Sequence, residues 1–211
     1  MKSKLTLFLS LLTLFFGVVS LEARLGESRS AIEGRLLKSG VGIAYEGERY
    51  LAKVTDNRVP YRYYVDMFPK GIEHAVYFKK GFGDEPPTTL DIELSERLKG
   101  RGLEVFPEGW DIHVVYLKGT SIFESYRLNG DSINHFVKNA ILDLNKGTSS
   151  WKMVGKDEKK VDSAFGYTHV LANGKFRALV INNTVIVYNP KLDETVFKRL
   201  DIKVPADIKG F

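Results

Sequence analysis

Four histidines are the side chains in this sequence best suited to acid–base or metal chemistry: His74, His113, His135 and His169. No two of them have a metal-ligand spacing such as His-x-x-x-His. His74 falls on the apolar face of a predicted strand, and His135 on the exposed side of a predicted helix. The sequence therefore predicts no metal site and no cofactor.

Asp111 and His113 are the one close carboxylate–imidazole pair. Alternation places both on one face of a predicted strand, opposite Trp110, Ile112 and Val114. Such a pair can act as a general base or bind a metal ion. A solvent-facing pair with no catalytic role is much commoner, and we expect that arrangement.

Three acids lie close to Trp110 in the chain, namely Glu104, Glu108 and Asp111. Glycoside hydrolysis uses two carboxyl groups across a cleft, and an aromatic ring beside acids is typical of sugar sites. A hydrolase or glycan-active enzyme is therefore one functional hypothesis. Because Glu104 and Glu108 fall in a polar predicted loop, solvated charges are the expected alternative.

Other catalytic signatures are missing from the sequence. Gly-x-Ser-x-Gly does not occur, and neither does an Asp-x-Asp calcium loop. Gly81-x-Gly83 is followed by two acids and two prolines, which would repel a phosphate. The sequence contains no cysteine, so thiolate catalysis and disulfides are excluded.

Tyrosines crowd the stretch around residue 61. If 61–68 is a strand, Tyr61 and Tyr63 share one face and Tyr64 lies on the other. Together with Trp110 these rings form a candidate surface for binding protein or glycan. Ordinary core packing is the alternative.

The first 23 residues predict a cleavable signal peptide. Lys2 and Lys4 precede an uncharged apolar stretch over 5–19, and small residues follow at Ser20 and Ala23. An uncleaved anchor is the alternative. We expect an exported bacterial protein, periplasmic or secreted, with no membrane span after cleavage. Without cysteine it cannot be a lipoprotein.

The charge pattern argues against nucleic acid as a partner. Lysine and arginine number 31 against 26 acids, a net charge of +5. The basic residues are interleaved with acids and form no continuous stripe.

The elements that must position these side chains indicate an α+β fold with antiparallel sheets and two main packed helices. Residues 24–128 read as a helix followed by strands. Residues 130–211 read as a second helix, a three-stranded meander and a C-terminal helix. The two segments form either tandem helix–sheet halves or one continuous domain. The predicted elements are a helix from Ser28, strands at 61–68, 72–80, 110–116 and 121–128, a helix at 131–144, strands at 165–172, 175–181 and 184–188, and a helix at 191–200.

Two resemblances bear on this chain. The pattern Gly26-x-Ser28-x-x-x-Ile32-x-x-x-Leu36 resembles the helix opening of envelope modules of the outer-membrane assembly lipoprotein and β-lactamase-inhibitor-protein type. Those modules pack helices on an antiparallel sheet and act by protein contact; the Gly-x-Pro that often follows in them is missing here.

Three further segments are similar to those of uncharacterised exported proteins of the Verrucomicrobia and related bacteria. They are 25–35, 109–113 and 144–151. This resemblance implies export and bacterial origin, and no chemistry. The leading hypothesis is an exported, non-enzymatic module that contacts another envelope or secreted protein.

Overall fold

The computed structural model describes residues 25–36, 42–46, 61–79, 109–129, 132–155, 158 and 161–203, with the main chain alone at 42–46 and 201–203. The predicted signal peptide, the acids Glu104 and Glu108, and the C-terminal tail lie outside the described residues.

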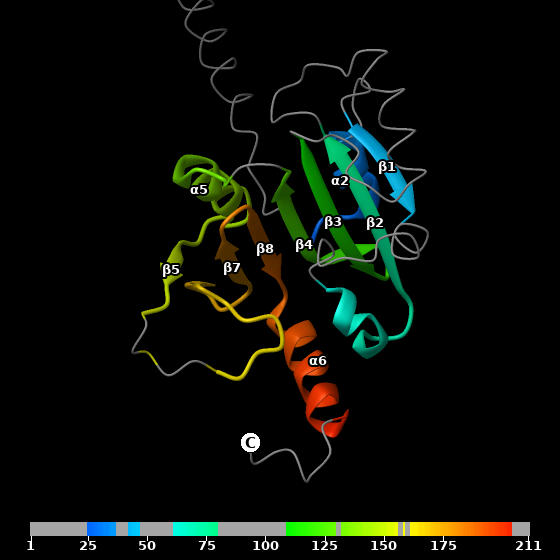
Figure 1. Cartoon of the computed structure of the whole chain (residues 1–211), viewed down its shortest axis with the longest axis vertical. Coiled ribbons are helices and arrows are strands. Elements are labelled where there is room, and N and C mark those ends of the chain that lie inside the picture. The colour runs from blue at the N-terminus through cyan, green and yellow to red at the C-terminus, as the bar shows by residue number, and fades with distance from the viewer. Residues whose placement is uncertain are drawn as a thin grey trace, which may run out of the picture.

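The chain has the predicted α+β class, and its described strands form one antiparallel sheet of eight (Figure 1). The helical elements are α2 (Arg29–Leu36), the 3-10 helix η2 (Arg62–Met67), α5 (His135–Leu144) and α6 (Pro190–Lys203). The strands are β1 (Gly42–Glu46), β2 (Ile72–Lys79), β3 (Trp110–Leu117), β4 (Thr120–Leu128), β5 (Trp151–Met153), β6 (His169–Leu171), β7 (Arg177–Ile181) and β8 (Thr184–Tyr188).

The strand order is β1-β2-β3-β4-β8-β7-β6-β5. Strands β1 to β4 form one meander, β5 to β8 form a second, and the last strands of the two meanders pair with each other. The junction is antiparallel, with Phe123 opposite Tyr188 and Arg127 opposite Thr184. The elements of the two predicted segments are thereby joined into a continuous sheet.

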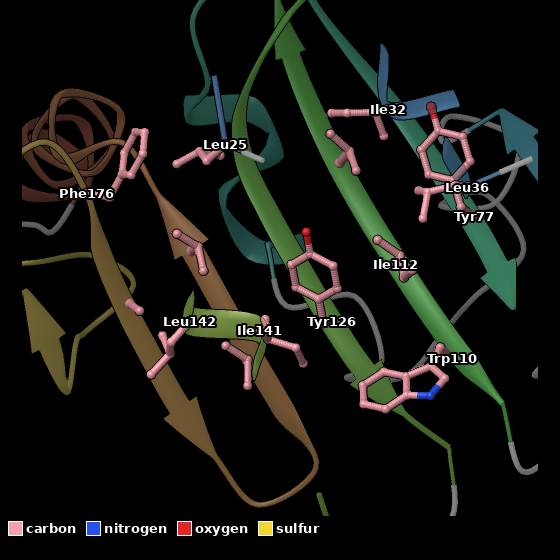
Figure 2. Packing of buried hydrophobic residues seen from close by; sticks show 14 of the residues in the cluster. Leu25, Ile32, Leu36, Tyr77, Trp110, Ile112, Tyr126, Ile141, Leu142 and Phe176 are labelled. Atoms are coloured by element: carbon pink, nitrogen blue, oxygen red, sulfur yellow. The ribbon is translucent and has the colours of Figure 1, made fainter. Parts of the chain in front are cut away.

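The sheet is covered on both faces. On one face, which we call the α2/α5 face, residues of both helices pack against Trp110, Ile112 and Tyr126 (Figure 2). On the opposite face, the α6 face, η2 and α6 pack over Phe78 and Phe123. The alternation over 72–80 predicts a half-buried strand, but residues 75–78 of β2 are all buried because both layers cover it.

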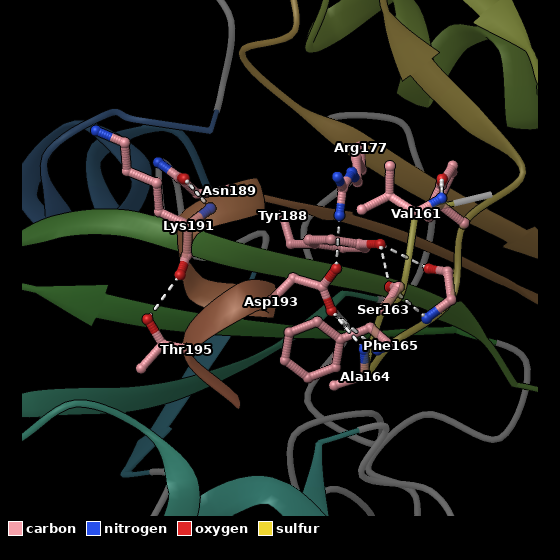
Figure 3. Close-up of polar contacts among 12 residues, drawn as sticks. Val161, Ser163, Ala164, Phe165, Arg177, Tyr188, Asn189, Lys191, Asp193 and Thr195 are labelled. Carbon is pink, nitrogen blue, oxygen red and sulfur yellow. Dashed lines mark hydrogen bonds and ion pairs between the residues drawn. The ribbon is translucent and has the colours of Figure 1, made fainter. Parts of the chain in front are cut away.

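Asp193 anchors α6 to this second layer (Figure 3). Its carboxylate is fully buried and accepts a hydrogen bond from Arg177 at 2.8 Å. The other carboxylate oxygen accepts from the main-chain N–H groups of Ala164 and Phe165, at 2.8 and 3.1 Å. The segment around residue 164 is thus fixed to the start of the helix.

The N-terminal helix agrees with the prediction. Ser28 caps it by accepting from the N–H of Ala31 at 3.2 Å, and Ile32 and Leu36 are both buried. The sequence predicts that this helix ends at Ser39-Gly40, and these two residues lie outside the described ones.

The strand predicted at 61–68 is wrong, because this segment forms η2. Its apolar side chains repeat every three residues, so Tyr61 and Met67 are buried, and Tyr64 between them is partly buried. Tyr63 is 73% exposed. The predicted pairing of Tyr61 and Tyr63 on one face is therefore wrong as well.

The helix predicted from Asp131 begins later, at His135. Asn134 caps it by accepting from the N–H of Val137 at 3.0 Å. Ile133 consequently reaches the core from the extended segment before the helix, and Phe136 is 73% exposed. The inward face of α5 is formed by Ile141 and Leu142.

The turns and short strands of the second meander also differ from the prediction. The sequences Asn173-Gly174 and Asn182-Asn183 predict tight type I′ turns. Neither forms one, because Lys118 is the only non-glycine with a positive φ among the described residues. That geometry belongs to the β3–β4 turn, where Lys118 and Gly119 have φ of 53° and 74°. Of the strand predicted at 165–172, only β6 is present.

Candidate functional site

The predicted pair Asp111 and His113 lies inside the molecule. Both side chains are on the α6 face of β3, opposite Arg127 and Ser125 of β4. Both are fully buried, so the expected solvent-facing pair is wrong. Alternation correctly placed them on one face, but the layer that covers this face comes from distant parts of the chain.

Each member of the pair has a partner other than its neighbour. Asn129 donates from Nδ2 to Asp111 Oδ1 at 2.8 Å. His113 Nδ1 lies 3.3 Å from the Tyr61 hydroxyl, and the Tyr61 ring meets the imidazole edge-on. The contact between His113 and Tyr61 therefore joins η2 to the centre of the sheet.

The electrostatics of His113 do not suit general-base catalysis. Burial, together with the positive charges of Arg127 and His74, lowers its pKa to about 3. A base with so low a pKa has little driving force for taking up a proton near neutral pH. We therefore interpret Asp111 and His113 as structural residues of the core.

The other predicted site residues are not brought together. Trp110 is buried on the α2/α5 face, on the opposite side of β3 from Asp111 (Figure 2). Tyr61 is buried on the α6 face, so the predicted aromatic surface of Tyr61, Tyr63, Tyr64 and Trp110 is wrong as a single surface. Glu104 and Glu108 lie outside the described residues.

A second polar cluster, missed at the sequence level, lies beneath α2. Tyr77 donates to Glu33 Oε1 at 3.0 Å and lies 3.0 Å from the Tyr116 hydroxyl. Tyr126 donates to the buried Glu124. Burial raises the pKa of Tyr77 to about 12, so the phenol stays protonated. The cluster fastens α2 to the sheet.

Lys146 lines two hollows on the surface of the described part of the chain. The first, of about 570 Å³, lies between Gly26–Ser28 and the turn after β6. The second, of about 470 Å³, lies between α5 and β5. Both flank the short connection between these two elements.

The second hollow has the composition of a contact surface. We call it the α5–β5 corner; its lining residues include Asn139, Asp143, Trp151, Met153 and His169. Trp151 is partly buried and donates from Nε1 to the carbonyl of Leu142 at 2.7 Å. Met153 is 75% exposed. The Trp151 indole is held by its hydrogen bond, so a partner can bury it together with Met153 at little cost in side-chain conformational entropy.

The polar groups at the α5–β5 corner include one exposed ion pair and one imidazole. Lys146 pairs with Asp143 at 3.0 Å on the exposed surface. Burial lowers the pKa of His169, which favours the neutral imidazole. No sequence pattern marked this corner, because it depends on the packing of α5 above β5.

The described residues hold no group of three His, Asp or Glu side chains arranged to bind a metal ion. Within the same part of the chain, no helix has the length and apolar character needed to cross a membrane.

Comparison with protein-family models, with curated proteins and with solved structures finds no significant match to this chain. The function must be inferred from its own geometry.

Proposed function

We propose that this is an exported, non-enzymatic protein that contacts another envelope or secreted protein through the α5–β5 corner. The proposal rests on the exposed apolar side chains around the 470 Å³ hollow. Phe136 and Met153 are 73% and 75% exposed, and Trp151 lines the hollow together with Met153.

The outer face of α5 extends this surface. Phe136, Asn139 and Asp143 are spaced three and four residues apart, so they follow one side of the helix. Asn139 and Asp143 line the hollow, and Phe136 continues the same side by one turn. An apolar centre with polar groups around it is the usual composition of a protein interface.

Export is supported by the position of Leu25. This residue is 1% exposed, and its N–H donates to Asn145 Oδ1 at 2.9 Å. A cut after Ala23 would leave only Arg24 ahead of Leu25, so the mature protein would keep Leu25 and its hydrogen bond to Asn145. The periplasm and the medium are both compatible with this proposal.

The alternative hypothesis, a hydrolase using Glu104, Glu108 and Asp111 near Trp110, has less support. Asp111 is buried on the face opposite to Trp110, so this acid and this ring cannot flank one sugar.

The test is affinity capture from the host envelope with three immobilised proteins: the wild type, Met153→Asp and the control Lys191→Glu. Lys191 is an exposed residue at the start of α6. We expect a defined protein to be retained by the wild type and by Lys191→Glu, and to be lost with Met153→Asp. Equal recovery on all three would contradict a role for the corner.

A further inference from the structure

We propose that the partner binds as an extended strand that adds to the open edge of β5. This inference rests on the proposed function and names the form of the partner. It follows from which main-chain groups of β5 point outward, and from the side chains beside them.

Strand β5 is the last in the sheet order and pairs only with β6 among the described strands. Its register places Trp151 opposite Leu171 and Met153 opposite His169. An edge strand offers a row of main-chain groups to which another extended segment can bind.

The hydrogen bonds to β6 identify the outward groups. Ala172 donates to the carbonyl of Ser150 at 2.8 Å, and Val154 donates to the carbonyl of Thr168 at 2.9 Å. In an antiparallel pair, alternate residues direct their N–H and C=O to the same neighbour. Residues 150, 152 and 154 therefore face β6, and the main-chain groups of Trp151 and Met153 face the open edge.

The same alternation separates the side chains. Trp151 and Met153 lie on the side of the hollow, whereas Lys152 lies on the other face and is exposed. An incoming strand would place alternate side chains against the apolar corner. The residue opposite Lys152 would lie close to its ammonium group, where an acid is favoured.

A second copy of this chain fits less well than another protein. The antiparallel β5–β5 register that uses both outward residues would hydrogen-bond Trp151 to Met153 of the other copy. That register places Lys152 directly opposite Lys152, and like charges in this position are destabilising. We therefore assign the edge to an extended segment of another protein that carries an acid between apolar side chains.

Because β5 is short, main-chain bonds alone would give a weak complex. Each of the two outward residues offers one N–H and one C=O. The apolar contact with Met153, Trp151 and the hollow must supply the remaining affinity and the selectivity.

The test uses a random-peptide library displayed on phage, selected against the purified wild type, Lys152→Glu and the control Lys191→Glu. We expect peptides selected on the wild type and on Lys191→Glu to be enriched in an acid flanked by apolar residues. These peptides should bind Lys152→Glu about tenfold more weakly. Peptides selected on Lys152→Glu should carry a basic residue at that place.

Amide hydrogen exchange gives the second measurement. In the free protein the amides of Trp151 and Met153 should exchange quickly, and a bound acidic peptide should protect both of them. Peptides that bind without protecting these amides, or a selection that yields no binder, would overturn strand addition.

The two proposals fail separately. If Met153→Asp abolishes capture of the envelope protein but the amides stay unprotected in the complex, the contact function stands and strand addition is wrong. If capture is unaffected by Met153→Asp, the proposed function itself is wrong.

Discussion

Asp193 is the residue on which the α6 layer depends most directly. It holds Arg177 and two main-chain N–H groups while fully buried (Figure 3). Removal of one partner of a buried ion pair leaves the other charge without compensation, which costs about 3 kcal/mol or more.

We predict that Asp193→Ala lowers the free energy of unfolding by about 3 kcal/mol, measured by urea denaturation. The adjacent Glu194 is exposed, so Glu194→Ala should change it by less than about 0.5 kcal/mol. Equal effects of the two substitutions would show that the buried contacts of Asp193 contribute little.

His113 makes stability depend on pH. Its pKa is about 3 in the folded protein, where Arg127, His74, Asp111 and Tyr61 surround it, and about 6.5 when the chain is unfolded. Between these values the unfolded chain binds a proton that the folded protein does not. The contribution is therefore complete above about pH 6.5 and is lost as the pH falls towards 3.

We predict that His113→Gln is less stable than the wild type at pH 7 but loses stability more slowly on acidification. The slope should differ by about 1 kcal/mol per pH unit between pH 6 and 4, as measured by urea unfolding at several pH values. Parallel curves for the two proteins would contradict a strongly lowered pKa for His113.

At the scale of elements, Asn145 ties the start of the chain to the end of α5. Its Oδ1 accepts from Leu25 and its Nδ2 donates to the carbonyl of Ile141, and the side chain is fully buried. Removing the amide leaves a buried N–H without its acceptor.

We predict that Asn145→Ala lowers the free energy of unfolding by about 2 kcal/mol. Asn139 lies exposed on the same helix, so Asn139→Ala is the matched control and should be neutral or slightly stabilising. Chemical denaturation of both variants checks this; a neutral Asn145→Ala would mean that water replaces the amide.

Elements with a clear local pattern could be predicted from the sequence, and others could not. The β3–β4 hairpin alternates apolar and polar residues around Lys118-Gly119, and α2 carries a capping serine. The 61–68 segment was misassigned because aromatic residues suit a strand as well as a 3-10 helix. Only the three-residue spacing of its apolar side chains distinguishes a 3-10 helix from a strand, and the segment is too short for that spacing to stand out in the sequence.

The candidate site could not be predicted for a different reason. The burial of Asp111 and His113, and the hollow above Met153, depend on which elements pack over the sheet. The pairing of β4 with β8 joins residues about sixty positions apart in the chain and has no local signal. Contacts of this kind arise only when the whole sheet has formed.

At the scale of the whole molecule, contacts on both faces join the two meanders. On the α2/α5 face Leu25 binds Asn145, and on the α6 face Arg199 donates to the carbonyls of Met67 and Phe68 at 2.8 and 2.6 Å. With the β4–β8 pairing between them, we expect the molecule to unfold as one cooperative unit.

The two tryptophans test this, because Trp110 belongs to the first meander and Trp151 to the second. We predict that the single-tryptophan variants Trp110→Phe and Trp151→Phe each show a fluorescence transition that coincides with their own loss of circular dichroism. A fluorescence midpoint separate from the circular-dichroism midpoint in either variant would indicate two independently folding halves.

The contact function itself is tested most directly in the living host by site-specific photo-cross-linking. A benzophenone side chain in place of Met153 should form a covalent adduct with one defined envelope or secreted protein. The same group in place of Lys191 should form no such adduct. Absence of any protein adduct at position 153, or the same adduct from both positions, would contradict binding through the α5–β5 corner.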